Sequence, residues 1–159
     1  MTTEQTKCAD IIRKEWRCRA ADLQALLTPD TLHRRALKKR LDALGANTYG
    51  INDVNELGEI ARDLFADYGL AFDYVAPGTF TDQRTGYWRY QMSYGGPSDE
   101  LRFYGAHTDR QPARIEYWFL DWFDGASIDV SGTVAGDVWE FFHDIGSVRA
   151  EFERATDEE

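Results

Sequence analysis

Histidine, cysteine and acidic side chains are the residues of this chain that could carry acid–base, nucleophilic or metal chemistry. The three histidines, His33, His107 and His143, lie far apart, and none has a second metal ligand at helical or hairpin spacing. The two cysteines, Cys8 and Cys18, lie on or beside an apolar helical stripe, where a thiol behaves as a small hydrophobic group. The residue pattern therefore predicts neither a metal site nor a cysteine nucleophile.

Other signatures of catalysis or cofactor binding are equally weak. Asp121, Asp124 and Asp129 surround Gly125, but their spacing lacks the alternate early ligands and the late Glu of a calcium-binding EF-hand loop. The sequence holds no Gly-x-Ser-x-Gly, and the pair Gly95-Gly96 does not join a strand to a helix as phosphate binding requires. We therefore predict a chain that is not an enzyme and has no cofactor.

Side chains that favour binding are concentrated in the second half. If the strongly apolar strand positions point to the core, the opposite face of the sheet displays mostly aromatic and charged residues. These are Tyr87, Arg89, Arg102, Tyr104, Arg114, Glu116, Trp118 and Trp122. Tyr, Trp and Arg dominate the hot spots of protein interfaces. Two outcomes remain open, since helices could also cover this face and make it a second core layer.

Charge is divided unevenly along the chain, whose formal net charge is −10. Residues 1–50 hold ten Lys and Arg against six Asp and Glu, whereas residues 51–159 hold eight Arg against 22 Asp and Glu. An acidic body repels nucleic acid and attracts basic protein surfaces. We therefore expect a protein partner with a basic surface and no direct nucleic-acid binding, and Asp121, Asp124 and Asp129 join the expected partner-binding residues.

A basic run interrupts this pattern in the first half. It consists of Arg34, Arg35, Lys38, Lys39 and Arg40. On a helix these side chains lie opposite Leu37 and Leu41 or along the edges of that apolar stripe. The run could contact phosphates or an acidic surface, or it could be a solvated helix face; the sequence leaves both open.

Hydrophobic periodicity predicts the elements that position these residues. Apolar residues at steps of three and four predict helices over about 4–27, 29–44 and 53–68, with Thr28 capping the second. After Gly69 the period changes to two, which is typical of strands, and helical spacing returns after Gly132. The predicted fold is α+β: N-terminal helices (about 1–69), a four- to five-stranded antiparallel sheet (about 70–130) and C-terminal helices (about 133–155).

Turn residues separate the predicted strands. They are Pro77-Gly78, Gly95-Gly96-Pro97, Thr108 to Pro112, and Asp124-Gly125. Such short connections predict a meander of antiparallel neighbours, and the last hairpin is expected to turn at Asp124-Gly125. Ten residues are predicted to form the core: Trp16, Leu41, Leu64, Phe72, Tyr90, Phe103, Tyr117, Phe119, Val138 and Phe142.

Length and composition predict one domain over residues 1–155, followed by a frayed tail at 156–159. The two cysteines are about 15 Å apart on one helix, too far for a disulfide. Reduced thiols without a visible signal peptide, and without an apolar run of membrane-spanning length, predict a cytoplasmic protein.

No family motif can be mapped onto the chain residue by residue. Small, acidic α+β chains without catalytic motifs occur among bacterial inhibitor and immunity proteins, including DNA-mimicking inhibitors, and this likeness is one of class only. The sequence therefore predicts a non-enzymatic, acidic protein-binding module of the inhibitor or immunity type. The alternatives are a small-ligand-binding domain that uses the aromatic sheet face, or a small enzyme.

Overall fold

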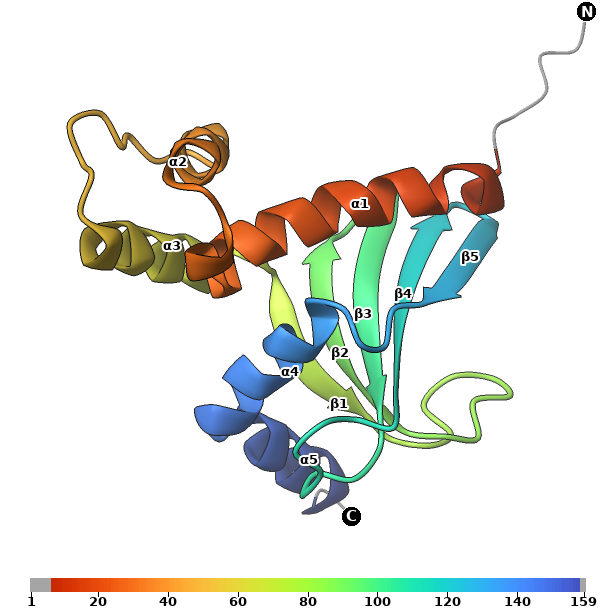
Figure 1. Ribbon diagram of the computed structural model, residues 1–159. Coiled ribbons are helices and arrows are strands. Elements are labelled where there is room, and N and C mark those ends of the chain that lie inside the picture. Colours follow the sequence, from red (N-terminus) through yellow and green to blue (C-terminus); the bar gives the residue numbers. More distant parts are fainter. Residues whose placement is uncertain (1–6, 158–159) are drawn as a thin grey trace, which may run out of the picture.

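The computed structural model describes residues 7–157 and places one sheet against a layer of helices (Figure 1). The helices are α1 (Cys8–Leu27), the short 3-10 turn η1 (Pro29–Thr31), α2 (Arg34–Ala43), α3 (Val54–Tyr68), α4 (Ala135–Asp144) and α5 (Ser147–Asp157). The strands are β1 (Ala71–Val75), β2 (Tyr87–Ser93), β3 (Ser98–Tyr104), β4 (Arg114–Asp121) and β5 (Asp124–Asp129). This order confirms the predicted α+β class.

The five strands lie side by side in chain order, and each neighbouring pair is antiparallel. This is the predicted meander. Trp88 lies opposite Phe103, and Leu101 lies opposite Tyr117, so these four side chains share one face of the sheet. Because side chains alternate along a strand, the residues between them point to the opposite side. We call the face that packs on the helices the inner face and the other the outer face.

Helix α1 crosses the inner face and connects two distant parts of the molecule (Figure 1). Its 20 residues span about 30 Å, from the β4–β5 hairpin to α2. Ile12, Trp16 and Leu23 are buried on one side of the helix, and the Trp16 ring lies 5.2 Å from the ring of Tyr117. The apolar stripe seen in the sequence is therefore the stripe that packs on the sheet.

A buried ion pair fixes α1 to the sheet. Arg19 donates two hydrogen bonds to the Asp99 carboxylate, at 2.7 and 2.9 Å, and the Tyr117 hydroxyl donates a third at 2.7 Å. Arg19 also donates to the hydroxyl of Tyr68 on α3. Burial and the neighbouring Asp99 carboxylate raise the pKa of Tyr117 above its ordinary value. Asp99 is 3% exposed and needs these donors, because an unpaired interior charge is costly.

The C-terminal helices cover the other end of the inner face. The Trp139 ring of α4 packs between Trp88 and Phe103, at centroid distances of 5.1 and 5.6 Å. The Trp88 indole N–H donates to the Val148 carbonyl of α5 at 2.9 Å. No helix within residues 7–157 is long and apolar enough to cross a membrane.

Most of the predicted core residues are buried. Seven of them are less than 9% exposed: Trp16, Leu41, Tyr90, Phe103, Tyr117, Phe119 and Val138. Leu64, Phe72 and Phe142 are partly buried and pack against this cluster. At the chain ends, residues 1–6 and 158–159 lie outside the described part, and Thr156 and Asp157, expected in the tail, belong to α5.

The second helix begins later than predicted. The Thr28 hydroxyl donates to the Gln24 carbonyl, so it does not cap a following helix. Pro29–Thr31 forms only the short turn η1. His33 then caps α2, because its Nδ1 accepts a hydrogen bond from the Arg35 amide at 3.3 Å. The competing hydrogen bond within α1 explains the wrong prediction.

Candidate functional site

The outer face brings together most of the predicted partner-binding residues. One row across the sheet consists of Asp73, Arg89, Arg102, Glu116 and Asp129, each paired with the next in the strand register. Helices α1, α3 and α4 pack on aromatic residues of the inner face. Of the two outcomes that the sequence left open, an uncovered outer face therefore fits the structure better than a second core layer.

Arg102 lies at the centre of this face, between two aromatic rings. Its guanidinium carbon is 3.9 Å from the centre of the Trp118 ring and 4.8 Å from that of Tyr87. Arg114 lies over Tyr104 in the same way, at 4.5 Å. Such cation–π stacks hold flat side chains in fixed positions. The outer face is therefore a packed, preformed surface.

Ion pairs neutralise much of the charge on this face. Arg89 pairs with Asp73 at 2.8 Å and Arg102 pairs with Glu100 at 2.8 Å. Arg114 lies 3.4 Å from the Glu116 carboxylate. Each of these three arginines thus lies beside a carboxylate, and the face lacks the continuous negative charge by which an acidic protein attracts a basic one.

Tyr87 was expected to be an exposed side chain, but the structure buries it. It lies on the outer face but is only 2% exposed, and burial raises the pKa of its hydroxyl. Arg102 stacks on its ring, and the β1–β2 loop (residues 76–86) lies beside it. Residues 80–85 of this loop and the outer face enclose an open cavity of about 570 Å³, lined also by Tyr104, Arg114 and Trp118.

The β4–β5 hairpin carries two strongly exposed aromatic side chains, the predicted residue Trp122 and its neighbour Phe123. Its two-residue turn is Trp122-Phe123, because Asp121 pairs with Asp124. The predicted turn at Asp124-Gly125 is therefore wrong. Trp122 is 81% exposed, and Phe123 is as exposed as in an extended chain, at 106%.

The backbone at this turn is unusual for a large side chain. Trp122 has a φ of 51°, whereas Phe123 has no positive φ. This sign pattern is that of a type II′ turn, in which glycine normally occupies the first position. A side chain in that region costs on the order of 1–3 kcal/mol, and such positions cluster at functional sites.

A third exposed aromatic residue lies in the neighbouring turn. Tyr94, between β2 and β3, is 82% exposed. The two turns adjoin, because a Cβ on Gly96 would lie 3.3 Å from Nε1 of Trp122. We call Tyr94, Trp122 and Phe123 the hairpin end. Sequence reasoning named Trp122 but missed Tyr94 and Phe123, whose turn positions were the available signal.

Two predicted carboxylates face α1 instead of the outer face. The Asp124 carboxylate accepts a hydrogen bond from the Cys8 amide at 2.7 Å, at the start of α1. This bond lowers the pKa of Asp124 below its ordinary value. Burial, together with Asp124 and Asp121, raises the pKa of the Cys8 thiol. These aspartates stabilise the helix N-terminus, which carries partial positive charge.

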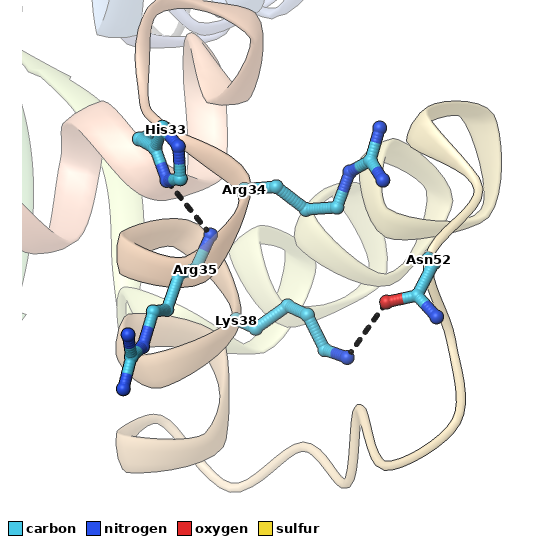
Figure 2. Close-up of a pocket in the computed structure, with 5 residues that line it drawn as sticks. All are labelled: His33, Arg34, Arg35, Lys38 and Asn52. Carbon is cyan, nitrogen blue, oxygen red and sulfur yellow. Dashed lines mark hydrogen bonds between the residues drawn. The ribbon is translucent and has the colours of Figure 1, made fainter.

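The basic run forms a groove at the opposite end of α1 (Figure 2). The groove has a volume of about 610 Å³ and is lined by His33, Arg34, Arg35, Lys38 and Asn52. Figure 2 shows Arg34 and Lys38 extending to the same side of α2. Lys38 Nζ donates to Asn52 Oδ1 at 3.2 Å.

Two of the three histidines, His107 and His143, line one cavity of about 450 Å³ with Thr108 and Arg149, whereas His33 lies apart at the start of α2. His33 caps α2, His107 stacks on Phe152 at 4.8 Å, and His143 lies near Trp139. Within residues 7–157 no three His, Cys, Asp or Glu side chains are grouped to hold a metal ion.

Comparison with models of known protein families, with curated proteins and with solved structures finds no match for the chain.

Proposed function

We propose that this chain is a non-enzymatic protein-binding module that docks through its hairpin end onto a basic protein surface containing an apolar cleft. The exposure of Trp122 and Phe123 on a two-residue turn carries this proposal. Two adjacent, solvent-exposed aromatic rings on a rigid hairpin supply large contact area at little cost in side-chain entropy.

The negative net charge of the chain indicates that the partner surface is positively charged. The chain carries a formal net charge of −10, and the carboxylates Glu56, Glu59, Asp63 and Glu140 of α3 and α4 are exposed. Such a field accelerates encounter with a basic surface. The aspartates of the hairpin face α1, so affinity rests on the aromatic rings and encounter rate on the overall charge. An inhibitor or immunity type of action is the simplest consequence, since a small chain that binds without turnover acts by occupying its partner's surface.

The pairing of arginines with carboxylates on the outer face supports ordinary protein docking over DNA mimicry. A mimic needs rows of carboxylates at phosphate-like spacing. Here Arg89, Arg102 and Arg114 each lie within 3.4 Å of a carboxylate oxygen.

The proposal is tested by isolating the partner and then measuring its binding kinetics. Tagged chain is used to isolate its partner from native cells, and binding of the purified partner is measured for wild type and for Trp122→Ala with Phe123→Ala. The double variant is expected to raise the dissociation rate at least about tenfold and to leave the salt dependence of association unchanged. Phe80→Ala, which removes a half-exposed aromatic ring from the β1–β2 loop, is the matched control.

Equal losses in the control and the double variant would contradict docking through the hairpin end. Turnover of a small molecule by the purified chain would contradict the non-enzymatic proposal itself.

A small-ligand site is the second candidate function, and the outer-face cavity of about 570 Å³ favours it. This volume lies within the range of ligand pockets. However, Arg102 and Arg114 are already engaged with Glu100 and Glu116, so a ligand must compete with internal ion pairs. A compound that raises the melting temperature of wild type but not of Arg114→Ala would support this candidate.

A further inference from the structure

The groove at α2 has a local charge opposite to that of the whole chain. Arg34, Arg35 and Lys38 line it within little more than one helical turn. None of the ion pairs formed within residues 7–157 includes any of these three side chains. By contrast, Arg40 on the same helix lies 3.4 Å from Asp22. The groove therefore holds cationic groups whose charge no carboxylate of the described chain neutralises by direct contact.

Arg34, Lys38 and Asn52 lie on one side of the groove, whereas Arg35 extends away from them (Figure 2). Arg34 and Lys38 are one turn apart and extend to the same side of α2, and Lys38 reaches Asn52 (Figure 2). The Asn52 amide oxygen accepts from Lys38, which leaves the NH₂ group of Asn52 as a further donor. His33 Nδ1 accepts from the Arg35 amide and so holds the start of α2 at the edge of the groove.

Phosphate is the group that this donor set recognises best. A guanidinium donates two parallel hydrogen bonds to phosphate oxygens, and an ammonium supplies a point charge beside them. The start of α2 adds the partial positive charge of a helix N-terminus. A groove of about 610 Å³ accommodates a ligand of nucleotide size.

The surroundings of the groove favour a short ligand over a polymer. From Arg34 to Lys38 the helix α2 rises only about 6 Å along its axis, which is room for one or two phosphate groups. The facing helix α3 is capped by Asp53 and carries Glu56 and Glu59 in its first two turns, and all three are exposed. A nucleic-acid strand that extended beyond the groove would meet these carboxylates and be repelled.

We infer that the groove formed by His33, Arg34, Arg35, Lys38 and Asn52 binds a small ligand through a phosphate or diphosphate group. This site is separate from the hairpin end, because the two lie at opposite ends of α1 (Figure 1). Occupation of the groove and protein docking can therefore be tested independently.

The experiment is a calorimetric titration with inorganic pyrophosphate at physiological ionic strength, repeated by amide NMR to locate the site. Arg34→Ala and Lys38→Ala are each expected to weaken binding about tenfold, since each removes charge-assisted hydrogen bonds. Lys39→Ala removes the same charge from the same helix outside the groove lining and is expected to weaken binding less than about twofold.

Asn52→Asp tests the groove without shortening a side chain. It places a carboxylate beside Lys38, so pyrophosphate binding is expected to disappear while circular dichroism and the melting temperature stay unchanged. Absence of pyrophosphate binding to wild type would overturn the inference. An equal loss in Lys39→Ala would overturn it too, as would tighter binding of a short single-stranded oligonucleotide than of pyrophosphate.

Discussion

The two ends of α1 present opposite kinds of binding surface. At its start, the hairpin end exposes three aromatic rings on tight turns, and Asp124 of the same hairpin bonds to the first helical amide. At its far end, the groove exposes long cationic side chains from a short helix. Aromatic rings lose little entropy on binding, whereas Lys and Arg lose up to about 2 kcal/mol each when they are fixed. The aromatic end therefore suits a protein surface, and the cationic end suits a small, strongly charged ligand.

The largest expected effect on stability comes from removing the buried ion pair that fixes α1 to the sheet. Asp99→Ala leaves the partly buried Arg19 guanidinium and the Tyr117 hydroxyl without their shared acceptor. We expect a loss of about 3 kcal/mol or more in the free energy of unfolding, measured by urea denaturation, because breaking a buried pair strands a charge.

Asp73→Ala is the matched control for this change. The ion pair between Asp73 and Arg89 has a similar N–O distance, 2.8 Å, but both of its side chains are about a quarter exposed. Its removal is expected to cost less than about 1 kcal/mol. Similar losses in the two variants would show that α1 does not depend on the buried pair.

At the hairpin end we expect a smaller change in the free energy of unfolding, and one that stabilises the fold. Trp122→Gly removes a side chain from a backbone with a φ of 51°, where glycine is the unstrained residue. Relief of strain outweighs the added flexibility of the unfolded chain, so the variant is expected to be as stable as wild type or more stable, by up to about 1 kcal/mol. Thermal and urea melts measure this.

Binding of the partner by Trp122→Gly should nevertheless fall. A stabilised variant that no longer binds would show that the exposed indole serves docking at the expense of stability. Clear destabilisation would mean instead that the ring contributes to the fold through its contact with the Gly96 turn.

Still smaller effects are expected at the groove. Arg34→Ala and Lys38→Ala are expected to change the free energy of unfolding by no more than about 0.5 kcal/mol, because neither side chain takes part in an ion pair within residues 7–157. Urea melts check this. A larger loss would assign these side chains a structural role and weaken the contrast between the two ends.

The pH dependence of stability sharpens the account of Asp124. Its pKa is lowered in the folded chain by the Cys8 amide, so its contribution is present above the unfolded pKa, about 3.9, and is lost as the pH falls through the folded value. Wild type should therefore lose more stability between pH 6 and pH 3 than Asp124→Asn, by a small margin because the carboxylate is exposed. Identical slopes in urea melts would contradict this role.

The fold was predictable because the hydrophobic period changes at Gly69 and returns after Gly132, which separates helices from sheet without tertiary information. The last hairpin was not predicted correctly. Asp124-Gly125 is a strong turn signal, whereas Trp122-Phe123 is a poor one, and only the pairing of β5 with β4 places the turn at the aromatic pair.

The candidate sites were predictable in part. Alternation placed Arg102 and Trp118 on the outer face, as the structure does. It could not show that the β1–β2 loop and Arg102 bury Tyr87, or that Asp124 reaches a helix 116 residues earlier in the chain. Both depend on contacts between distant segments, which periodicity does not encode. The basic run was recognised, but the groove depends on Asn52, which lies outside it.

Site-specific photo-crosslinking of the purified partner tests most directly which end of α1 docks on protein. A benzophenone amino acid replaces Phe123 at the hairpin end in one variant, and Tyr49, 92% exposed beside α2, in the other. Both positions are exposed aromatic residues, so the two substitutions disturb the fold equally little. We expect an adduct with the partner from the Phe123 position and none from the Tyr49 position. An adduct from Tyr49 without one from Phe123 would contradict docking through the hairpin end.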